Sequence, residues 1–125
     1  MKLSNNSLGV IIWSGNYKKL AQWYEKTIGF KVKSTQDIPG DTYVAFEIGD
    51  NYFSVGQHSE IKGNNKDPKR IMIGFNVVSV TAVFNELKPK GVKFIAEPFE
   101  SPEGGYWVTT LQDPEGNVFQ FFGSK

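Results

Sequence analysis

The sequence contains no cysteine and a single histidine, His58. The lack of cysteine excludes disulfides, thiolate metal ligands and cysteine nucleophiles. One histidine excludes any site in this chain that needs two imidazoles. An excess of charge of one sign is also missing, since 14 Lys and Arg stand against 13 Asp and Glu, for a formal net charge of +1. This balance argues against nucleic acid as a partner.

Long hydrophobic runs are missing too. The apolar stretch near the start, from Leu8 to Trp13, is too short to span a membrane or to form the apolar part of a signal peptide. We therefore expect no membrane association and, because cysteine is also missing, a cytoplasmic location. The length of 125 residues favours a single domain, residues 1–125, with enough chain to bury a core without disulfides.

Aromatic residues are plentiful, with ten Phe, five Tyr and three Trp. The chain as a whole follows an internal repeat of one strand, one helix and three strands. The first copy spans residues 5–58, a polar linker spans 59–70, and the second copy spans 71–123. We expect strands at 8–13, 30–35, 42–48, 52–58, 71–78, 92–96, 106–112 and 118–122, and helices at 17–28 and 80–88. The segment 98–105 reads as a loop.

The register of the repeat can be checked along the chain. Aligning Gly9 with Met72 also aligns Leu20 with Val83 within the two helices. Asn16 and Ser79 are the expected N-caps of these helices. Gly29 and Gly91 are the expected glycines that end them. The pattern therefore predicts an α+β fold of two βαβββ modules.

Alternation along the strands assigns one face of each sheet to the core and leaves a second, mixed face. That second face combines aromatic and polar side chains, whereas a solvated sheet face would be plainly polar. A mixed concave surface suits a small-molecule site, and equally suits packing between modules or between chains. The candidate ligand-binding residues are Trp13, Tyr43, Glu47, Ser54, Asn76, Thr110, Gln120 and Phe122.

Two motifs carry a resemblance to a known family. Residues 23–30, Trp-Tyr-Glu-Lys-Thr-Ile-Gly-Phe, are similar to a helix end, and residues 113–117, Asp-Pro-Glu-Gly-Asn, to a hairpin, of the vicinal oxygen chelate superfamily. This superfamily includes glyoxalases, extradiol dioxygenases, and fosfomycin- and bleomycin-resistance proteins. The resemblance covers nearly the whole chain and implies a glyoxalase-like fold, a concave sheet face and pairing into homodimers.

The resemblance also implies metal ligands at four positions, usually His in the first strand of each module and Glu in the last. Those positions hold Gly9, Ser54, Met72 and Gln120. Because one neutral amide oxygen does not hold a divalent cation, we expect no metal and no cofactor. The alternative is a displaced metal site that uses His58, Glu47 or Glu97.

Nucleophilic catalysis finds little support, since Ser54 and His58 lie about 13 Å apart on a regular strand. The expected function is metal-free small-molecule binding of the bleomycin-resistance type, with sequestration of an antibiotic or toxic aromatic compound. The near-neutral charge departs from what a cationic drug such as bleomycin requires. Two alternatives stay open. One is a metal-dependent lyase, isomerase or dioxygenase of the same superfamily, and the other is a dimeric interaction module without a pocket.

Overall fold

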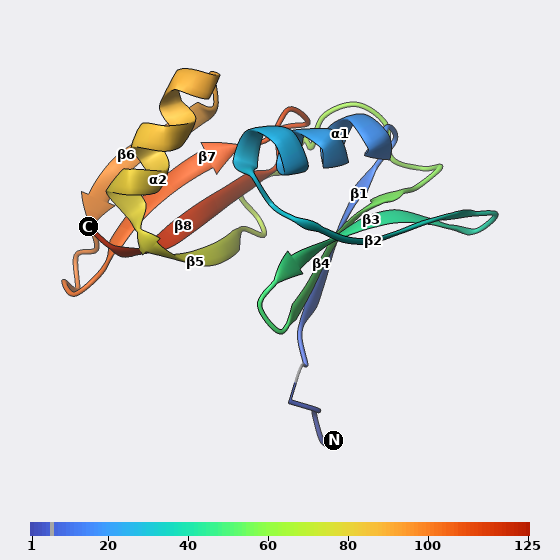
Figure 1. The fold of residues 1–125 in the computed structure, drawn as a ribbon, viewed down its shortest axis with the longest axis horizontal. Coiled ribbons are helices and arrows are strands. Elements are labelled where there is room, and N and C mark those ends of the chain that lie inside the picture. Colours follow the sequence, from blue (N-terminus) through green and yellow to red (C-terminus); the bar gives the residue numbers. More distant parts are fainter. Residues whose placement is uncertain (6) are drawn as a thin grey trace. The chain divides into compact units, whose positions relative to one another are not determined.

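A computed structural model describes residues 1–5 and 7–125 as two compact units, Met1–Gly63 and Asn64–Lys125 (Figure 1). The boundary between them falls within the segment 59–70. Each unit runs strand, helix, strand, strand, strand. The α+β class and the two βαβββ modules are therefore confirmed.

The first unit forms a four-stranded sheet in the order β1-β4-β3-β2. Its elements are β1 (Gly9–Ser14), α1 (Tyr17–Trp23), β2 (Val32–Ile38), β3 (Asp41–Ile48) and β4 (Asn51–Gln57). The strands β2, β3 and β4 pair antiparallel, whereas β1 pairs parallel with β4. A parallel pair needs a long crossover, which α1 and the following two strands provide.

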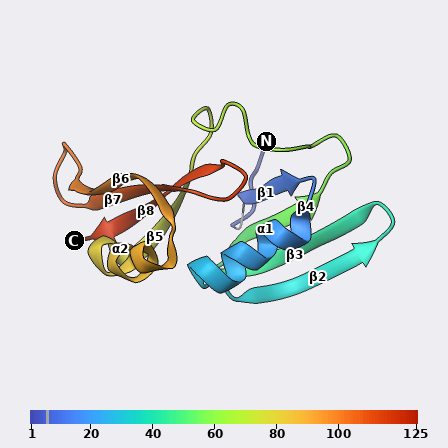
Figure 2. The same cartoon turned by 90° about the horizontal axis from the view of Figure 1, so that it is seen from above.

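The second unit repeats this plan in the order β5-β8-β7-β6. Its elements are β5 (Ile73–Ser79), α2 (Val80–Leu87), β6 (Lys93–Glu100), β7 (Trp107–Gln112) and β8 (Val118–Ser124). Strand β5 pairs parallel with β8, and the other neighbours pair antiparallel. In each unit the helix covers one face of its own sheet (Figures 1 and 2).

Both helices end as the glycines predict, although the last turns are irregular. After α1 the chain widens into a π-helical turn, Tyr24–Ile28, and Gly29 follows with a φ of 94°. After α2 a 3₁₀ turn, Lys88–Lys90, ends at Gly91 with a φ of 80°. Glycine is favoured at both positions because side chains disfavour a positive φ. In the described ranges no helix is long and apolar enough to cross a membrane.

The start of α1 differs from the prediction, whereas that of α2 agrees. The side chain of Asn16 makes no capping hydrogen bond. Instead the Tyr17 amide donates to Oε1 of Gln57, at 3.2 Å, from the end of β4. In α2 the predicted cap is present, since the Ala82 amide donates to Oγ of Ser79 at 3.2 Å.

The predicted loop at 98–105 is too long. Strand β6 continues through Pro98 to Glu100, and only the turn that follows is irregular. Proline fits because β6 is an edge strand, where no neighbour needs the missing N–H. The turn is closed by a hydrogen bond of 2.9 Å from the Ser101 amide to the Tyr106 carbonyl.

Each unit has its own aromatic core beneath its helix. In the first unit the ring of Tyr24 packs against Phe46 and Phe53, with centroids 6.3 and 5.5 Å away. In the second unit Phe75 packs edge-on against Phe119 at 5.8 Å. The phenylalanine rings lie on the sheet faces that alternation assigns to the core, so the opposite face of each sheet is left to other side chains.

Candidate ligand pocket on the first sheet

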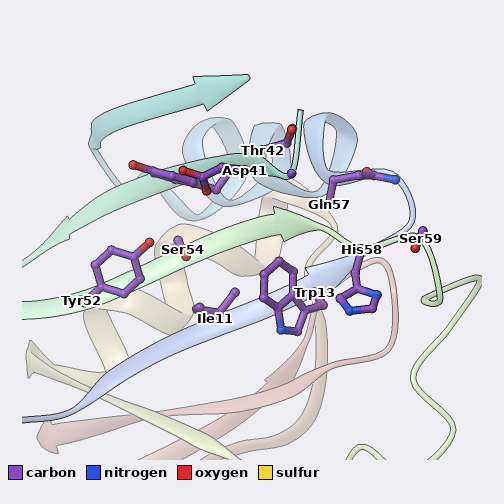
Figure 3. A pocket seen from close by; sticks show the side chains of 11 residues that line it. Ile11, Trp13, Asp41, Thr42, Tyr52, Ser54, Gln57, His58 and Ser59 are labelled. Carbon is purple, nitrogen blue, oxygen red and sulfur yellow. The ribbon is translucent and has the colours of Figure 1, made fainter. Parts of the chain in front are cut away.

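A pocket of about 440 Å³ lies on the face of the first sheet opposite the core rings (Figure 3). Its floor comes from β1 and β4, and its rim from the start of β3 and the end of β4. The lining residues all belong to the first unit and are Ile11, Trp13, Gly40, Asp41, Thr42, Tyr43, Tyr52, Ser54, Gln57, His58 and Ser59. The residues that line this pocket thus come from one module.

The indole of Trp13 can lie against the floor of the pocket because the residue beneath it is a glycine. Trp13 pairs with Gly56 across β1 and β4. A Cβ added to Gly56 would lie 2.7 Å from Cζ3 of Trp13, so the ring occupies the space that any larger residue would fill. The ring of His58 meets the indole edge-on with centroids 5.3 Å apart. Even so Trp13 is 45% exposed, which leaves part of the indole open to a ligand.

Ser54 is the buried polar group of the pocket. It lies on the central strand β4 between Ile11 of β1 and Ala45 of β3, and it is 1% exposed. Among the described residues its Oγ is the buried side-chain polar atom that has no hydrogen-bond partner within the protein. A buried hydroxyl without a partner costs about 1–3 kcal/mol. A hydroxyl of this kind is a group that a bound water or a ligand atom can satisfy.

The polar rim is partly occupied by interactions within the protein. Nδ1 of His58 accepts a hydrogen bond of 3.1 Å from the Glu60 amide. The side-chain Nε2 of Gln57 donates a hydrogen bond of 2.9 Å to the Gly15 carbonyl. Its Oε1 accepts the hydrogen bond from the Tyr17 amide at the start of α1. These contacts fix the end of β4. The lining contains one carboxylate, Asp41, and no Lys or Arg.

Three of the predicted ligand-binding residues, Trp13, Tyr43 and Ser54, come together in this pocket. Glu47 belongs to the same sheet but lies outside the lining. Its carboxylate is 3.6 Å from Nζ of Lys31, with both side chains largely exposed. Glu47 therefore makes a surface ion pair, which contributes little to stability.

The other four predicted residues lie in the second unit. Nε2 of Gln120 donates a hydrogen bond of 3.1 Å to Oγ1 of Thr110, its partner across β7 and β8. Phe122 lies opposite Asn76 across β5 and β8, and its ring covers Gly74. They share one sheet, and their part in ligand binding stays a prediction.

Several lining residues were not among the predicted ligand-binding residues. Ile11, Tyr52 and His58 fall on the mixed face by alternation, so the signal for them was present. Asp41, Thr42 and Gln57 reach the pocket because of where the hairpin of β2 and β3 and the end of β4 lie. Strand alternation carries no information about that placement.

The residues present do not fit the divalent metal that the superfamily commonly uses. Gly9 has no side-chain donor, Met72 offers a soft thioether, and the amide of Gln120 is bonded to Thr110. The hydroxyl of Ser54 is neutral. Across residues 1–5 and 7–125 no three His, Asp or Glu side chains are grouped so that they could hold an ion. Two of the three residues considered for a displaced metal site form ion pairs instead. The carboxylate of Glu97 lies 3.6 Å from Nζ of Lys88, and that of Glu47 lies 3.6 Å from Nζ of Lys31.

Sequence comparison agrees with this geometry. The family model of the Glyoxalase/Bleomycin resistance protein/Dioxygenase superfamily matches residues 8–121. The chain belongs to this superfamily. Among curated proteins no sequence matches this glyoxalase superfamily member. Its fold is shared by many solved structures.

Three of these structures illustrate the likeness. A glyoxalase family protein from Enterococcus faecalis is 18% identical, with 91% of this chain and 94% of that chain covered and a TM-score of 0.72. TioX from a Micromonospora species is 16% identical, with 94% and 98% covered and a TM-score of 0.71. A mutant of glyoxalase I from Zea mays is 19% identical, with 92% and 44% covered and a TM-score of 0.72. At these identities the likeness concerns the fold of the superfamily.

Proposed function

We propose that this superfamily member is a small-molecule binding protein that holds an aromatic ligand in the pocket of its first unit without a metal. The observation that carries the proposal is that the half-exposed indole of Trp13 and the hydroxyl of Ser54, which has no partner within the protein, line the same pocket. The lining combines the aromatic rings of Trp13, Tyr43 and Tyr52 with polar side chains, and small-molecule sites likewise join aromatic contacts to placed polar groups. Sequestration of an antibiotic or another toxic aromatic compound needs no chemistry beyond such binding.

The metal-free character rests on the chemistry of the side chains. The four positions where the superfamily usually has metal ligands hold Gly9, Ser54, Met72 and Gln120, and none is an anionic or imidazole donor. Hard divalent cations prefer several oxygen ligands with carboxylates among them. Binding in this pocket therefore relies on aromatic contact and hydrogen bonds and not on a metal ion.

The test is binding of planar aromatic compounds, followed by tryptophan fluorescence. Trp13 contributes to the pocket, whereas Trp107 lies in the second unit with Lys125 Nζ 5.0 Å from its ring centroid. We expect Trp13→Phe to remove most of the quenching and to weaken binding at least tenfold. The matched variant Trp107→Phe should bind as the wild type does.

Two results would contradict the proposal. One is binding that survives Trp13→Phe unchanged. The other is conversion of the bound compound into a product during incubation with the purified protein, detected by mass spectrometry. A binding protein returns its ligand with the mass it had before incubation.

A homodimer is part of the same proposal. Several large apolar side chains are exposed, among them Leu8, Val78, Ile95 and Phe99. Exposed apolar surface favours association between chains. Light scattering coupled to size-exclusion chromatography should give twice the mass of the chain, and the mass of one chain would contradict this part of the proposal.

A further inference from the structure

The polar groups of the pocket differ sharply in what they can still bind. The amide of Gln57 and Nδ1 of His58 are engaged within the first unit. The hydroxyl of Ser54 has no partner, and the residue is 1% exposed. The most buried hydroxyl of the site therefore still has hydrogen-bonding capacity, whereas polar groups of the rim, such as the Asp41 carboxylate, are exposed to solvent.

A hydroxyl in this position can act as donor and as acceptor because its proton rotates. Its neighbours across the strands are the apolar side chains of Ile11 and Ala45. Neither offers a partner, so a ligand that reaches the floor supplies the first one. A ligand of the same shape that has no polar atom near Ser54 leaves the hydroxyl unpaired. It should therefore bind more weakly than a ligand that forms this hydrogen bond.

Charge narrows the choice further. The lining has no Lys or Arg, and its one carboxylate, Asp41, is exposed at the rim. An anionic ligand would lose its hydration in the pocket without gaining a cationic partner. The exposed Asp41 is screened by water and gives a cation only a weak attraction.

The walls set the shape of the ligand. Trp13, Tyr43 and Tyr52 line the pocket with aromatic rings, and Trp13 is kept in place by its contact with Gly56. Aromatic rings pack well against planar ring systems in offset or edge-on arrangements. The pocket volume of about 440 Å³ is large enough for a flat bicyclic molecule.

We infer that Ser54 sets the specificity of this pocket. Its hydroxyl pairs with a hydrogen-bonding atom on an uncharged, planar aromatic ligand, and the pocket discriminates against anions and against hydrocarbons of the same shape. This inference rests on the proposed function and adds the chemical class of the ligand. Ser54 acts as a binding residue with no part in a chemical step.

Three probes of nearly one shape test the inference. They are 2-naphthol, which has a hydroxyl, naphthalene, which has no polar atom, and naphthalene-2-carboxylate, which is an anion. Binding is followed by the indole N–H resonance of Trp13 in the full chain, assigned with Trp13→Phe. We expect wild-type protein to bind 2-naphthol at least tenfold more tightly than naphthalene, with the carboxylate weakest.

The variant Ser54→Ala should remove the advantage of 2-naphthol and leave the affinity for naphthalene nearly unchanged. The replacement deletes an unpaired polar atom, so we expect the protein to stay folded, which its melting temperature checks. Ser101→Ala is the matched control, because Ser101 is also buried but lies in the turn after β6. It should keep the wild-type preference.

The outcomes separate this inference from the proposed function. If all three probes bind equally, or if the preference survives Ser54→Ala, the inference is wrong while the pocket and the proposed function remain. The second case would mean that another polar group of the lining bonds to the hydroxyl of 2-naphthol. If no probe shifts the Trp13 resonance, the proposed function fails and the inference fails with it.

Discussion

Gly56 is the residue at which one added methyl group would reach the pocket directly. Its ideal Cβ would lie 2.7 Å from Cζ3 and 3.0 Å from Cε3 of Trp13, and 3.4 Å from the Thr42 carbonyl. The carbonyl limits how far the backbone can retreat. The indole must therefore move, and overpacking of this kind costs about 1–3 kcal/mol.

We predict that Gly56→Ala weakens binding of 2-naphthol at least tenfold by displacing Trp13. Gly74→Ala is the matched control, since its Cβ would lie 2.5 Å from Cε2 of Phe122 in the second unit. It should destabilise the protein by a similar amount in urea unfolding but bind 2-naphthol normally. Wild-type affinity in Gly56→Ala, or an equal loss in both variants, would show that the position of Trp13 does not control the site.

The difference between Glu47 and Ser54 shows what the sequence can tell about single residues. Alternation places both on the face away from the core. It does not say how far along the strand a side chain lies from the pocket. Glu47 pairs with Tyr52 toward one end of the hairpin and contacts Lys31, whereas Ser54 faces Ala45 in the middle of the sheet. The sheet face on which a side chain lies could be predicted from periodicity. Whether that side chain reaches the pocket depends on the register between the strands.

Among the elements, the two helices begin in different ways. The start of α2 is encoded locally, because Oγ of Ser79 accepts a hydrogen bond from the Ala82 amide three residues on. The same Oγ also donates a hydrogen bond of 2.7 Å to the distant Lys125 carbonyl. The start of α1 depends on Gln57, which lies 40 residues further along the chain. A local cap can be recognised in the sequence, whereas a cap supplied by another strand cannot.

This difference gives a prediction for stability. Ser79→Ala should lower the free energy of unfolding by about 1 kcal/mol, as loss of an N-cap does. Gln57→Ala should cost about 1–2 kcal/mol, because it removes the hydrogen bonds to Tyr17 and Gly15. Asn16→Ala should change it by less than about 0.5 kcal/mol, as for other surface positions. Urea unfolding measures all three, and a larger cost for Asn16→Ala than for Gln57→Ala would contradict this account.

The strands were predicted well where the chain alternates and poorly where an edge relaxes the rules. The ends of β3 and β7 lie within one residue of the expected ones. The predicted strand ends at Ala96, four residues before the end of β6, because a proline such as Pro98 usually interrupts a strand. Its place at the edge of the second sheet, with register shifts on either side of Ala96, accommodates the proline. Edge position is a property of the sheet and is not visible in the segment itself.

At the scale of the whole molecule, the repeat and two short motifs were enough to predict the superfamily and its fold. Each sheet has an aromatic ring that covers a glycine of the neighbouring strand, but the two units place the ring and the glycine on opposite strands of the pair. In the first sheet a ring from β1, Trp13, covers a glycine of β4, whereas in the second a ring from β8, Phe122, covers Gly74 of β5. The repeat therefore preserves the fold while the surface chemistry of the two sheets differs.

The last prediction concerns divalent metals and the molecule as a whole. A ligand at about 100 times its Kd stabilises a protein by about 2.7 kcal/mol, which raises Tm by several degrees. Because Gly9, Ser54, Met72 and Gln120 offer no anionic or imidazole donor, we expect Mg²⁺, Mn²⁺, Ni²⁺ and Zn²⁺ to leave Tm unchanged. Chelator treatment should likewise leave 2-naphthol binding unchanged. A saturable rise in Tm with one of these ions, abolished by His58→Ala or Glu47→Gln, would instead establish a displaced metal site and return the superfamily's metal-dependent chemistry to this chain.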